Sequence, residues 1–131
     1  MRVEEMSDEG VNVEIAKLLY PNCDIIAEDG YALQFPIAST SGTCSPSSPT
    51  ASYQMPIPMY DYCNSWTDVM PHVFELGIDA EMLRDGDGIA YCKAEFWYKY
   101  DTDCITQENE NPTRALAECL LKVLRYKNNV V

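Results

Sequence analysis

The segment from Pro36 to Pro58 constrains the fold of this chain more than any other feature. It contains five of the chain's eight prolines and six serines, and it has no charged residue. That composition is typical of a loop, and a loop of this length is uncommon in a compact domain unless it is functional or disordered. We therefore predict a flexible Pro/Ser-rich loop over 36–58, inserted between two structured halves.

The length and charge of the chain limit the class of protein. Its 131 residues fit one domain, 1–131, which buries roughly two thirds of the surface of the unfolded chain. There are 21 acidic and 9 basic side chains, a net charge of -12 and a pI near 4.2. This charge disfavours direct binding to nucleic acid or to an anionic membrane and suits a basic protein surface. An acidic surface can also serve only to keep a protein in solution.

The N-terminus and the cysteines indicate a reducing compartment. The start, MRVEEMSDEG, has acidic residues where a signal peptide needs a basic region followed by an apolar one, and no apolar run is long enough to span a membrane. We therefore expect a cytoplasmic protein with free thiols. The closest two cysteines are 12 positions apart and the chain has one histidine, so we expect no metal and no cofactor. The cysteines are at positions 23, 44, 63, 92, 104 and 119.

The chain before the loop predicts a helix followed by strands. From Ser7 to Tyr20, apolar residues recur on one helical face, Ser7 or Asp8 can cap the helix, and the proline after Tyr20 ends it. From Asp24 to Ile37, alternating apolar residues surround the pair Asp29-Gly30, which indicates a short hairpin or one bent strand.

A second helix is predicted directly after the loop. Ser65 and Asp68 form a capping-box pattern, and Gly77 ends the helix. Pro71 removes one backbone hydrogen bond, which predicts a kink or a regular part that begins near that residue. The apolar pattern of this helix comprises Trp66, Val69, Met70, Val73 and Leu76.

Cys63 is the one candidate nucleophile, because it lies at the start of this helix and a helix N-terminus lowers the pKa of a thiol. The chain's histidine, His72, lies one step off the apolar pattern, where we expect it to be exposed. A histidine-paired thiol also needs an orienting group and an oxyanion site, for which the sequence offers no candidate. We therefore interpret Cys63 as a packed residue without a catalytic role.

A long strand is predicted from Ile89 to Tyr100, because apolar and polar residues alternate there. The turn Asp85-Gly86-Asp87-Gly88 would pair it with the segment 78–84 in a hairpin. The same turn does not match a calcium loop, since Leu83 and Ala94 would occupy the first and last ligand positions. The predicted core face of the strand comprises Ala90, Cys92, Ala94, Phe96 and Tyr98.

The terminal segment NPTRALAECLLKVLRYKNN predicts the third helix, with Asn111 as cap and Pro112 at its first position. Its apolar stripe comprises Leu116, Cys119, Leu120, Val123 and Leu124, and the opposite, free face carries Arg114, Glu118 and Lys122. The fold class is therefore α+β: a small, mostly antiparallel sheet packed against about three helices in a layered α/β sandwich.

Four segments together resemble the small phage and prophage proteins of the phage ABA sandwich domain type. These segments are NVEIAKL, YDYCNSW, ELGI and NPTRALAECLLKVL, in this order, and the resemblance covers most of the chain outside the loop. It implies a layered α/β fold, a bacteriophage origin and a place in the host bacterial cytoplasm. It supplies no catalytic residues.

Three classes of function remain, and the first is a non-catalytic protein that inhibits a host defence or nucleic-acid-handling protein in the manner of an anti-CRISPR. Residues 61–110 hold 12 acidic and 3 basic side chains, so carboxylates can occupy a basic groove meant for phosphates. The predicted contact set, with two aromatic anchors, is Asp79, Glu81, Asp85, Asp87, Tyr91, Glu95, Trp97, Asp101 and Asp103.

The alternatives to this interpretation stay open. The contact set can instead be a solvated face whose aromatic residues are covered by the first helix or by a second subunit in a homodimer. A second class is a binder of a small molecule such as a signalling nucleotide, for which Lys93 and Lys99 would meet the phosphate. The third class, an enzyme, is disfavoured because the sequence has no nucleophile elbow, phosphate loop, metal cluster or general base.

Overall fold

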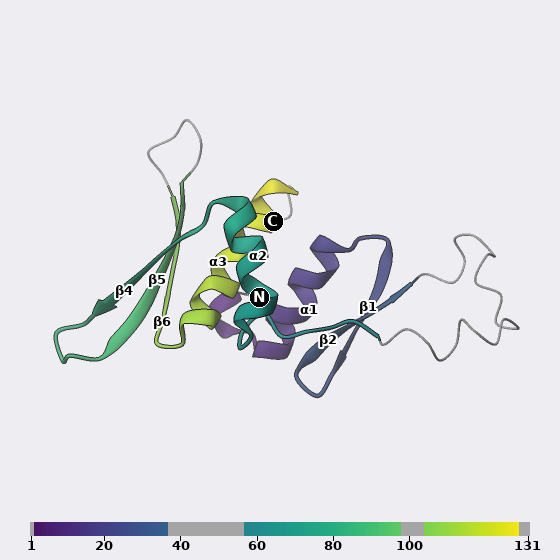
Figure 1. Cartoon of the computed structure of the whole chain (residues 1–131), viewed down its shortest axis with the longest axis horizontal. Helices are drawn as coiled ribbons and strands as arrows, with labels where there is room; N and C mark the ends of the chain where they lie inside the picture. The colour runs from purple at the N-terminus through teal and green to yellow at the C-terminus, as the bar shows by residue number, and fades with distance from the viewer. Residues whose placement is uncertain (1, 37–56, 98–103, 129–131) are drawn as a thin grey trace, which may run out of the picture.

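The computed structural model describes residues 2–36, 57–97 and 104–128. It has the predicted α+β class, with helices between two small antiparallel sheets (Figure 1). The predicted loop lies outside the described residues except at its two ends. In chain order the elements are η1 (Val3–Glu5), α1 (Asp8–Leu19), β1 (Cys23–Glu28), β2 (Tyr31–Pro36), β3 (Met59–Tyr60), α2 (Trp66–Leu76), β4 (Asp79–Arg84), β5 (Ala90–Trp97), β6 (Cys104–Asn109) and α3 (Pro112–Lys127).

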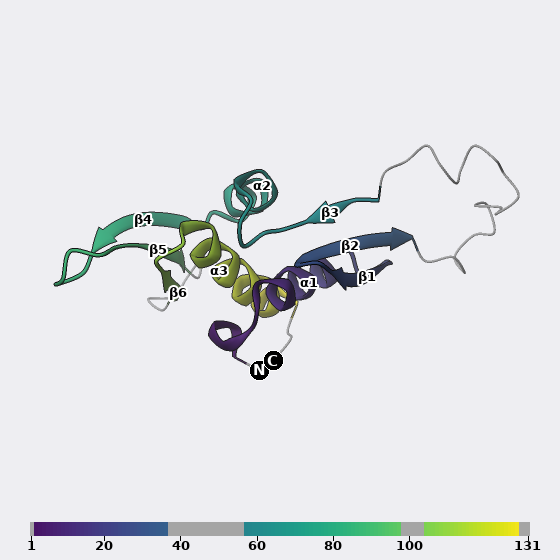
Figure 2. The ribbon, with the colours of Figure 1, turned by 90° about the horizontal axis from the view of Figure 1, so that it is seen from below.

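The strands form two separate sheets where the sequence suggested one. Sheet A has the order β1-β2-β3 and sheet B the order β4-β5-β6, and every neighbouring pair is antiparallel. Sheet A packs on α1, sheet B packs on α3, and the two helices pack on each other. Figures 1 and 2 show the sheets at opposite ends of the molecule. Each hairpin buries its apolar face against a different helix, so the two hairpins do not have to pair into one sheet to form a core.

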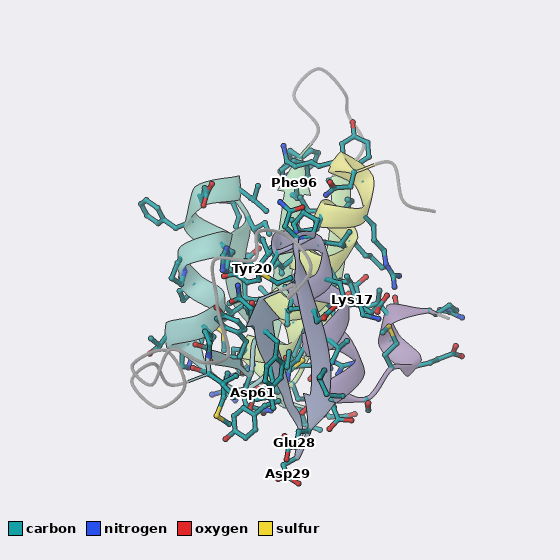
Figure 3. The ribbon with its side chains drawn as sticks, turned by 90° about the vertical axis from the view of Figure 1, so that its right-hand side faces the viewer. Lys17, Tyr20, Glu28, Asp29, Asp61 and Phe96 are labelled. Carbon is teal, nitrogen blue, oxygen red and sulfur yellow. The ribbon has the colours of Figure 1, made fainter. Side chains whose placement is uncertain are left out.

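The part of the chain before the loop forms the predicted helix and a hairpin. Ser7 caps α1, because its hydroxyl accepts a hydrogen bond from the Gly10 amide at 3.0 Å. Between β1 and β2, Asp29 and Gly30 have φ angles of 52° and 88°, the geometry of a tight hairpin turn. Figure 3 looks onto sheet A, with Glu28 and Asp29 at the tip of this hairpin.

Helix α2 begins and ends as its caps predict. The Ser65 hydroxyl accepts from the Asp68 amide at 3.3 Å, and the Asp68 carboxylate accepts from the Asp61 amide at 2.9 Å, so it reaches further back than a capping box requires. Gly77 ends the helix with a φ of 74°. The helix is continuous from Trp66 through Pro71, so the prediction of a regular part that begins near Pro71 is wrong. The hydrogen bonds of Ser65 and Asp68 hold the first turn in place, so the helix tolerates the loss of the one backbone hydrogen bond that Pro71 cannot donate.

The predicted apolar pattern of α2 is only half buried. Val69 and Val73 are buried and Leu76 is half-buried, whereas Trp66 and Met70 are exposed, so the five residues of the pattern do not form one core face. The physical reason is position: α2 packs on α3 along one side and lies at the surface of the molecule (Figure 2).

The predicted hairpin before α3 is confirmed in sheet B. Strands β4 and β5 pair from Asp79 opposite Glu95 to Arg84 opposite Ala90. Cys92 and Ala94 are buried against α3 as predicted. Of the other residues on that predicted face, Phe96 is half-buried, Ala90 is exposed next to the hairpin turn, and Tyr98 lies outside the described residues.

Helix α3 has the predicted bounds, but its predicted free face is buried. Arg114 and Glu118 are 7% and 1% exposed, so the expectation that they face solvent is wrong. Helix α3 is enclosed by sheet B, α1, α2 and η1, and this leaves little of its first three turns in contact with water. Lys122 remains half-exposed and lies 3.1 Å from Glu4 of η1.

Candidate functional site

The outer face of sheet B is the candidate interaction site. Side chains alternate along a strand, so the neighbours of the buried Cys92 and Ala94 point away from α3. Residues that pair across the strands share a face, which defines the members of this surface. The outer face of sheet B comprises Asp79, Glu81, Leu83, Tyr91, Lys93, Glu95, Trp97, Cys104, Thr106 and Glu108.

The structure brings five of the nine predicted contact residues together on this face. They are Asp79, Glu81, Tyr91, Glu95 and Trp97. Asp79 and Glu81 are exposed, Tyr91 and Glu95 are half-buried, and the Trp97 side chain is 51% exposed. The face therefore combines accessible carboxylates with an accessible indole, as an aromatic anchor requires.

Lys93 is the one basic residue on this face, and carboxylates surround it. Its ammonium lies 3.6 Å from the Glu95 carboxylate, and Lys93 pairs across the strands with Glu81 on one side and Glu108 on the other. Lys93 therefore offers little attraction for a phosphate group. Lys99, the second lysine of the small-molecule alternative, lies outside the described residues.

Asp85 has a structural task in the hairpin turn. One oxygen of its carboxylate accepts hydrogen bonds from the amides of Asp87 and Ile89, each at 2.9 Å. The Arg84 guanidinium donates to the Gly88 carbonyl at 2.8 Å and closes the same turn. Asp85 and Asp87 are both exposed, so their role as contact residues stays a prediction, although the turn already uses one oxygen of the Asp85 carboxylate.

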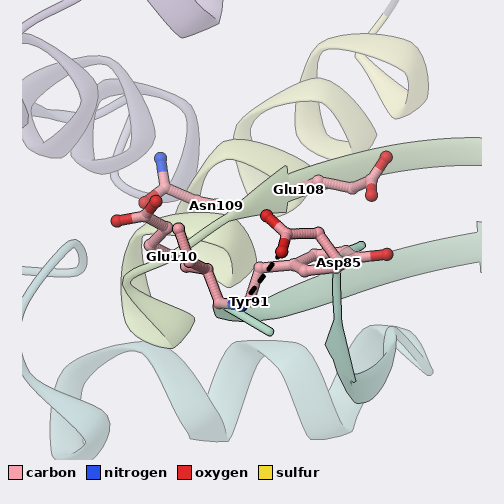
Figure 4. Close-up of a pocket in the computed structure, with 6 residues that line it drawn as sticks. Asp85, Tyr91, Glu108, Asn109 and Glu110 are labelled. Carbon is pink, nitrogen blue, oxygen red and sulfur yellow. Dashed lines mark hydrogen bonds between the residues drawn. The ribbon is translucent and has the colours of Figure 1, made fainter. Parts of the chain in front are cut away.

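Two further predicted contact residues, Asp101 and Asp103, lie outside the described residues. The sequence-based contact set also missed two neighbours, Glu108 and Glu110. With Asp85 they border an open hollow at the hairpin end of sheet B, which Ile89, Tyr91 and Asn109 also line (Figure 4). Three carboxylates around one aromatic ring suit a cationic group and repel a phosphate.

The carboxylates of Glu108 and Glu110 were missed because strand β6 was not predicted. The segment CITQEN has one strongly apolar residue, so its alternation is weak. The β-branched pair Ile105-Thr106 is the signal that could have revealed the strand.

Cys63 is a packed residue, as predicted. It is fully buried, and its sulfur lies 3.7 Å from the Asp8 carbonyl oxygen and 3.9 Å from the Arg114 guanidinium. Burial raises the pKa of the Cys63 thiol to about 12, although Arg114 opposes the shift. The lowering expected from the helix N-terminus is therefore overturned, and at neutral pH the group is a thiol, the weak form of the nucleophile.

The expectation that His72 is exposed is wrong. His72 is half-buried, with its ring 5.9 Å from the Tyr62 ring in an edge-to-face contact. Burial lowers the pKa of His72. The ring is thus engaged with Tyr62, while the sulfur of Cys63 is engaged with Asp8 and Arg114.

Burial of the thiols predicts a reactivity pattern. We expect Cys63 and Cys119, whose pKa values are both raised to about 12 by burial, to resist modification by a disulfide reagent at about pH 8, because very little thiolate forms. Cys23 and Cys104 are half-exposed free thiols and should react in the folded protein. Peptide mass mapping with and without denaturant measures this, and rapid labelling of native Cys63 would contradict it. All six thiols should be reactive in denaturant.

Arg114 is the centre of a buried polar cluster that the sequence did not predict. Its guanidinium donates to the Glu118 carboxylate at 2.6 Å, to the Asp8 carboxylate at 2.7 Å and to the Met6 carbonyl at 2.7 Å. Thr113, the residue before Arg114, donates through its hydroxyl to the Cys63 carbonyl. These bonds connect α3 to the N-terminal segment, to α1 and to the residues just before α2. We therefore assign the cluster a role in the stability of the fold.

The fold and the site define a small α+β protein with an acidic, aromatic sheet face. No family model matches the chain, and no curated protein matches it either. Within residues 2–36, 57–97 and 104–128, there is no group of three or more histidine, cysteine or carboxylate side chains placed to hold a metal ion. Within the same ranges, none of the helices combines the length and apolar character that crossing a bilayer needs.

Proposed function

We propose that the protein acts by binding, and that the outer face of sheet B docks on a basic surface of a host defence or nucleic-acid-handling protein. The observation that carries this proposal is the union of exposed carboxylates, Asp79, Glu81 and Glu108, with the exposed indole of Trp97 on one open sheet face. The resemblance to small phage proteins supports the choice of a host protein as partner.

The physical basis of the proposal is charge complementarity around an anchor. Carboxylates fixed on a rigid sheet can take the place of phosphates in a basic groove, and long-range attraction speeds the encounter. Aromatic side chains are enriched among the few residues that contribute most of the affinity of an interface. Lys93 is held among Glu81, Glu95 and Glu108, so it does not oppose the approach of a basic surface.

A binder of nucleotides is the weaker alternative. The hollow at the hairpin end of sheet B is lined by Asp85, Glu108 and Glu110, and these carboxylates would repel a phosphate. Co-purification of a nucleotide with the protein would nevertheless favour this alternative over ours.

Charge reversal tests the proposed binding face. The variant Asp79→Lys/Glu81→Lys/Glu108→Lys should lose capture of the partner from a bacterial host lysate at low salt, because the field of the face changes sign. Wild-type capture should also weaken at high salt, since screening at about 1 M salt reduces the Debye length to about 3 Å. Mass spectrometry of the eluted proteins, with thermal melting of each variant, is the measurement.

A matched control variant distinguishes the effect of the outer face of sheet B on capture from the effect of net charge. The variant Glu5→Lys/Glu28→Lys/Glu75→Lys reverses three exposed carboxylates on η1, β1 and α2, none of them in sheet B, and changes the net charge equally. It should retain capture. With a partner in hand, Trp97→Ala should cost about 2 kcal/mol, or about thirtyfold in affinity. Capture that survives both the reversal on sheet B and high salt would refute the proposal.

A further inference from the structure

One flank of α2 exposes large apolar side chains without any charge. Trp66, Met70 and Phe74 are 52%, 36% and 85% exposed. These three residues are four positions apart, so on an α-helix they lie within an arc of about 80°. Thr67 and Pro71, also exposed and uncharged, extend the same surface. We call these five residues the α2 flank.

The rest of α2 explains why this flank stays uncovered. Val69 and Val73 form the side that packs on α3, and they are the buried residues of the helix. Asp68 and His72 lie on the opposite side of the helix from Trp66, Met70 and Phe74, and Glu75 lies between that side and Pro71, at the edge of the α2 flank. A helix with one buried side normally exposes polar residues elsewhere, so a second apolar stripe is a candidate contact surface.

The spacing of Trp66, Met70 and Phe74 makes the α2 flank complementary in shape to the α2 flank of a second copy. Residues four positions apart form a ridge on a helix surface, and two such ridges interlock when the helices cross at about 50°. Trp66 and Phe74 are about 12 Å apart along the axis, with Met70 midway between them. In an antiparallel pair, Met70 would lie on the two-fold axis and each Trp66 would pack against Phe74 of the other copy. This is the symmetry of an isologous dimer.

We infer that the α2 flank is a self-association surface, through which two copies of the chain pack α2 against α2 about a two-fold axis. The charge of the protein argues for this face. Two copies with a net charge of -12 repel each other, and the outer face of sheet B would bring carboxylates together. The outer face of sheet A is apolar at Ile26 and Met59, but Glu28 and Asp29 border it. The five residues of the α2 flank carry no charge, and Glu75 borders them only beside Pro71, about 100° around the helix from Phe74.

The exposed area sets the strength of the dimer. Side chains of this size each present about 150 to 250 Å² when free, so the three exposed fractions amount to roughly 350 Å² per copy. A stable interface buries about 800 Å² per partner. The dimer is therefore weak and forms as protein concentration rises. Salt should strengthen it, because screening reduces the repulsion between two acidic copies. This salt dependence is opposite in sign to that of the proposed host contact.

Analytical ultracentrifugation over a wide range of protein concentration tests the dimer. Wild-type protein should shift from monomer towards dimer as concentration rises, and more so at high salt. Phe74→Glu and Met70→Glu should each remain monomeric at every concentration. Met82→Glu places the same charge on another exposed apolar side chain, on β4, and should behave as wild type. Melting curves verify that each variant folds, which is expected because Phe74 is 85% exposed.

Tryptophan fluorescence locates the contact. The chain has two tryptophans, so Trp97→Phe leaves Trp66 as the single reporter. Its emission should shift to the blue, and its quenching by acrylamide should fall, as the dimer forms. A monomer at the highest concentration would overturn the inference, as would dissociation by salt or an equal effect of Met82→Glu. None of these outcomes bears on host binding, which charge reversal on sheet B tests separately.

Discussion

Replacing Arg114 with methionine is expected to lower the free energy of unfolding by about 3 to 5 kcal/mol. The variant removes the guanidinium that lies 2.6 Å from Glu118 and 2.7 Å from Asp8. Glu118 is 1% exposed, so its carboxylate would keep its desolvation cost and lose the partner that offsets it. The carbonyls of Val3 and Met6 would lose their donor as well. Urea denaturation monitored by circular dichroism measures the change.

Two further variants test whether the loss of stability in Arg114→Met arises because the charge is buried. Lys122→Met breaks a half-exposed pair with Glu4 and should cost less than about 1 kcal/mol. Arg114→Met combined with Glu118→Leu should recover part of the loss, because two apolar side chains leave no buried charge. Recovery should be incomplete, since Gln107 donates to Glu118 at 2.9 Å and would then lack this acceptor. Equal costs for Arg114→Met and Lys122→Met would contradict the account.

Local signals in the sequence predicted the elements whose ends are set by local chemistry. Ser7 and Ser65 accept amide hydrogen bonds as N-caps, and Gly77 has the positive φ that ends α2. The Asp29-Gly30 pair forms the turn of the first hairpin. These features depend on residues a few positions apart, so the chain carries them without reference to the tertiary structure.

Burial could not be predicted where it depends on distant parts of the chain. Arg114 and Glu118 are four positions apart, a spacing that is common on exposed helix surfaces, and nothing local distinguishes a buried pair. Their burial arises because η1 and α1 cover that side of α3. The same limit applies to α2, where Val69 and Trp66 belong to one apolar pattern but only Val69 is buried.

The candidate site was predicted in part for a related reason. The alternation of β5 put Tyr91, Glu95 and Trp97 on one face, and the register with β4 added Asp79 and Glu81. The period of a strand is two residues, so it fixes these faces once the hairpin turn is known. Glu108 joins them only through β6, whose weak alternation gave no prediction. The hydrogen bonds from the turn amides to the Asp85 carboxylate likewise could not be predicted from the sequence.

The second large effect is expected at Leu120, which lies in the predicted stripe of α3 and is fully buried. Leu120→Ala should lower the free energy of unfolding by about 2 to 5 kcal/mol, because the enclosed helix cannot move to fill the space left by the side chain. Met82→Ala, which truncates a 61% exposed side chain on β4, should change stability little and serves as the control. Thermal and urea denaturation of both variants provide the measurement. An unchanged melting temperature for Leu120→Ala would mean that α3 is not enclosed by the sheet and helices described above, and the placement of the buried Arg114 cluster on that helix would then be wrong as well.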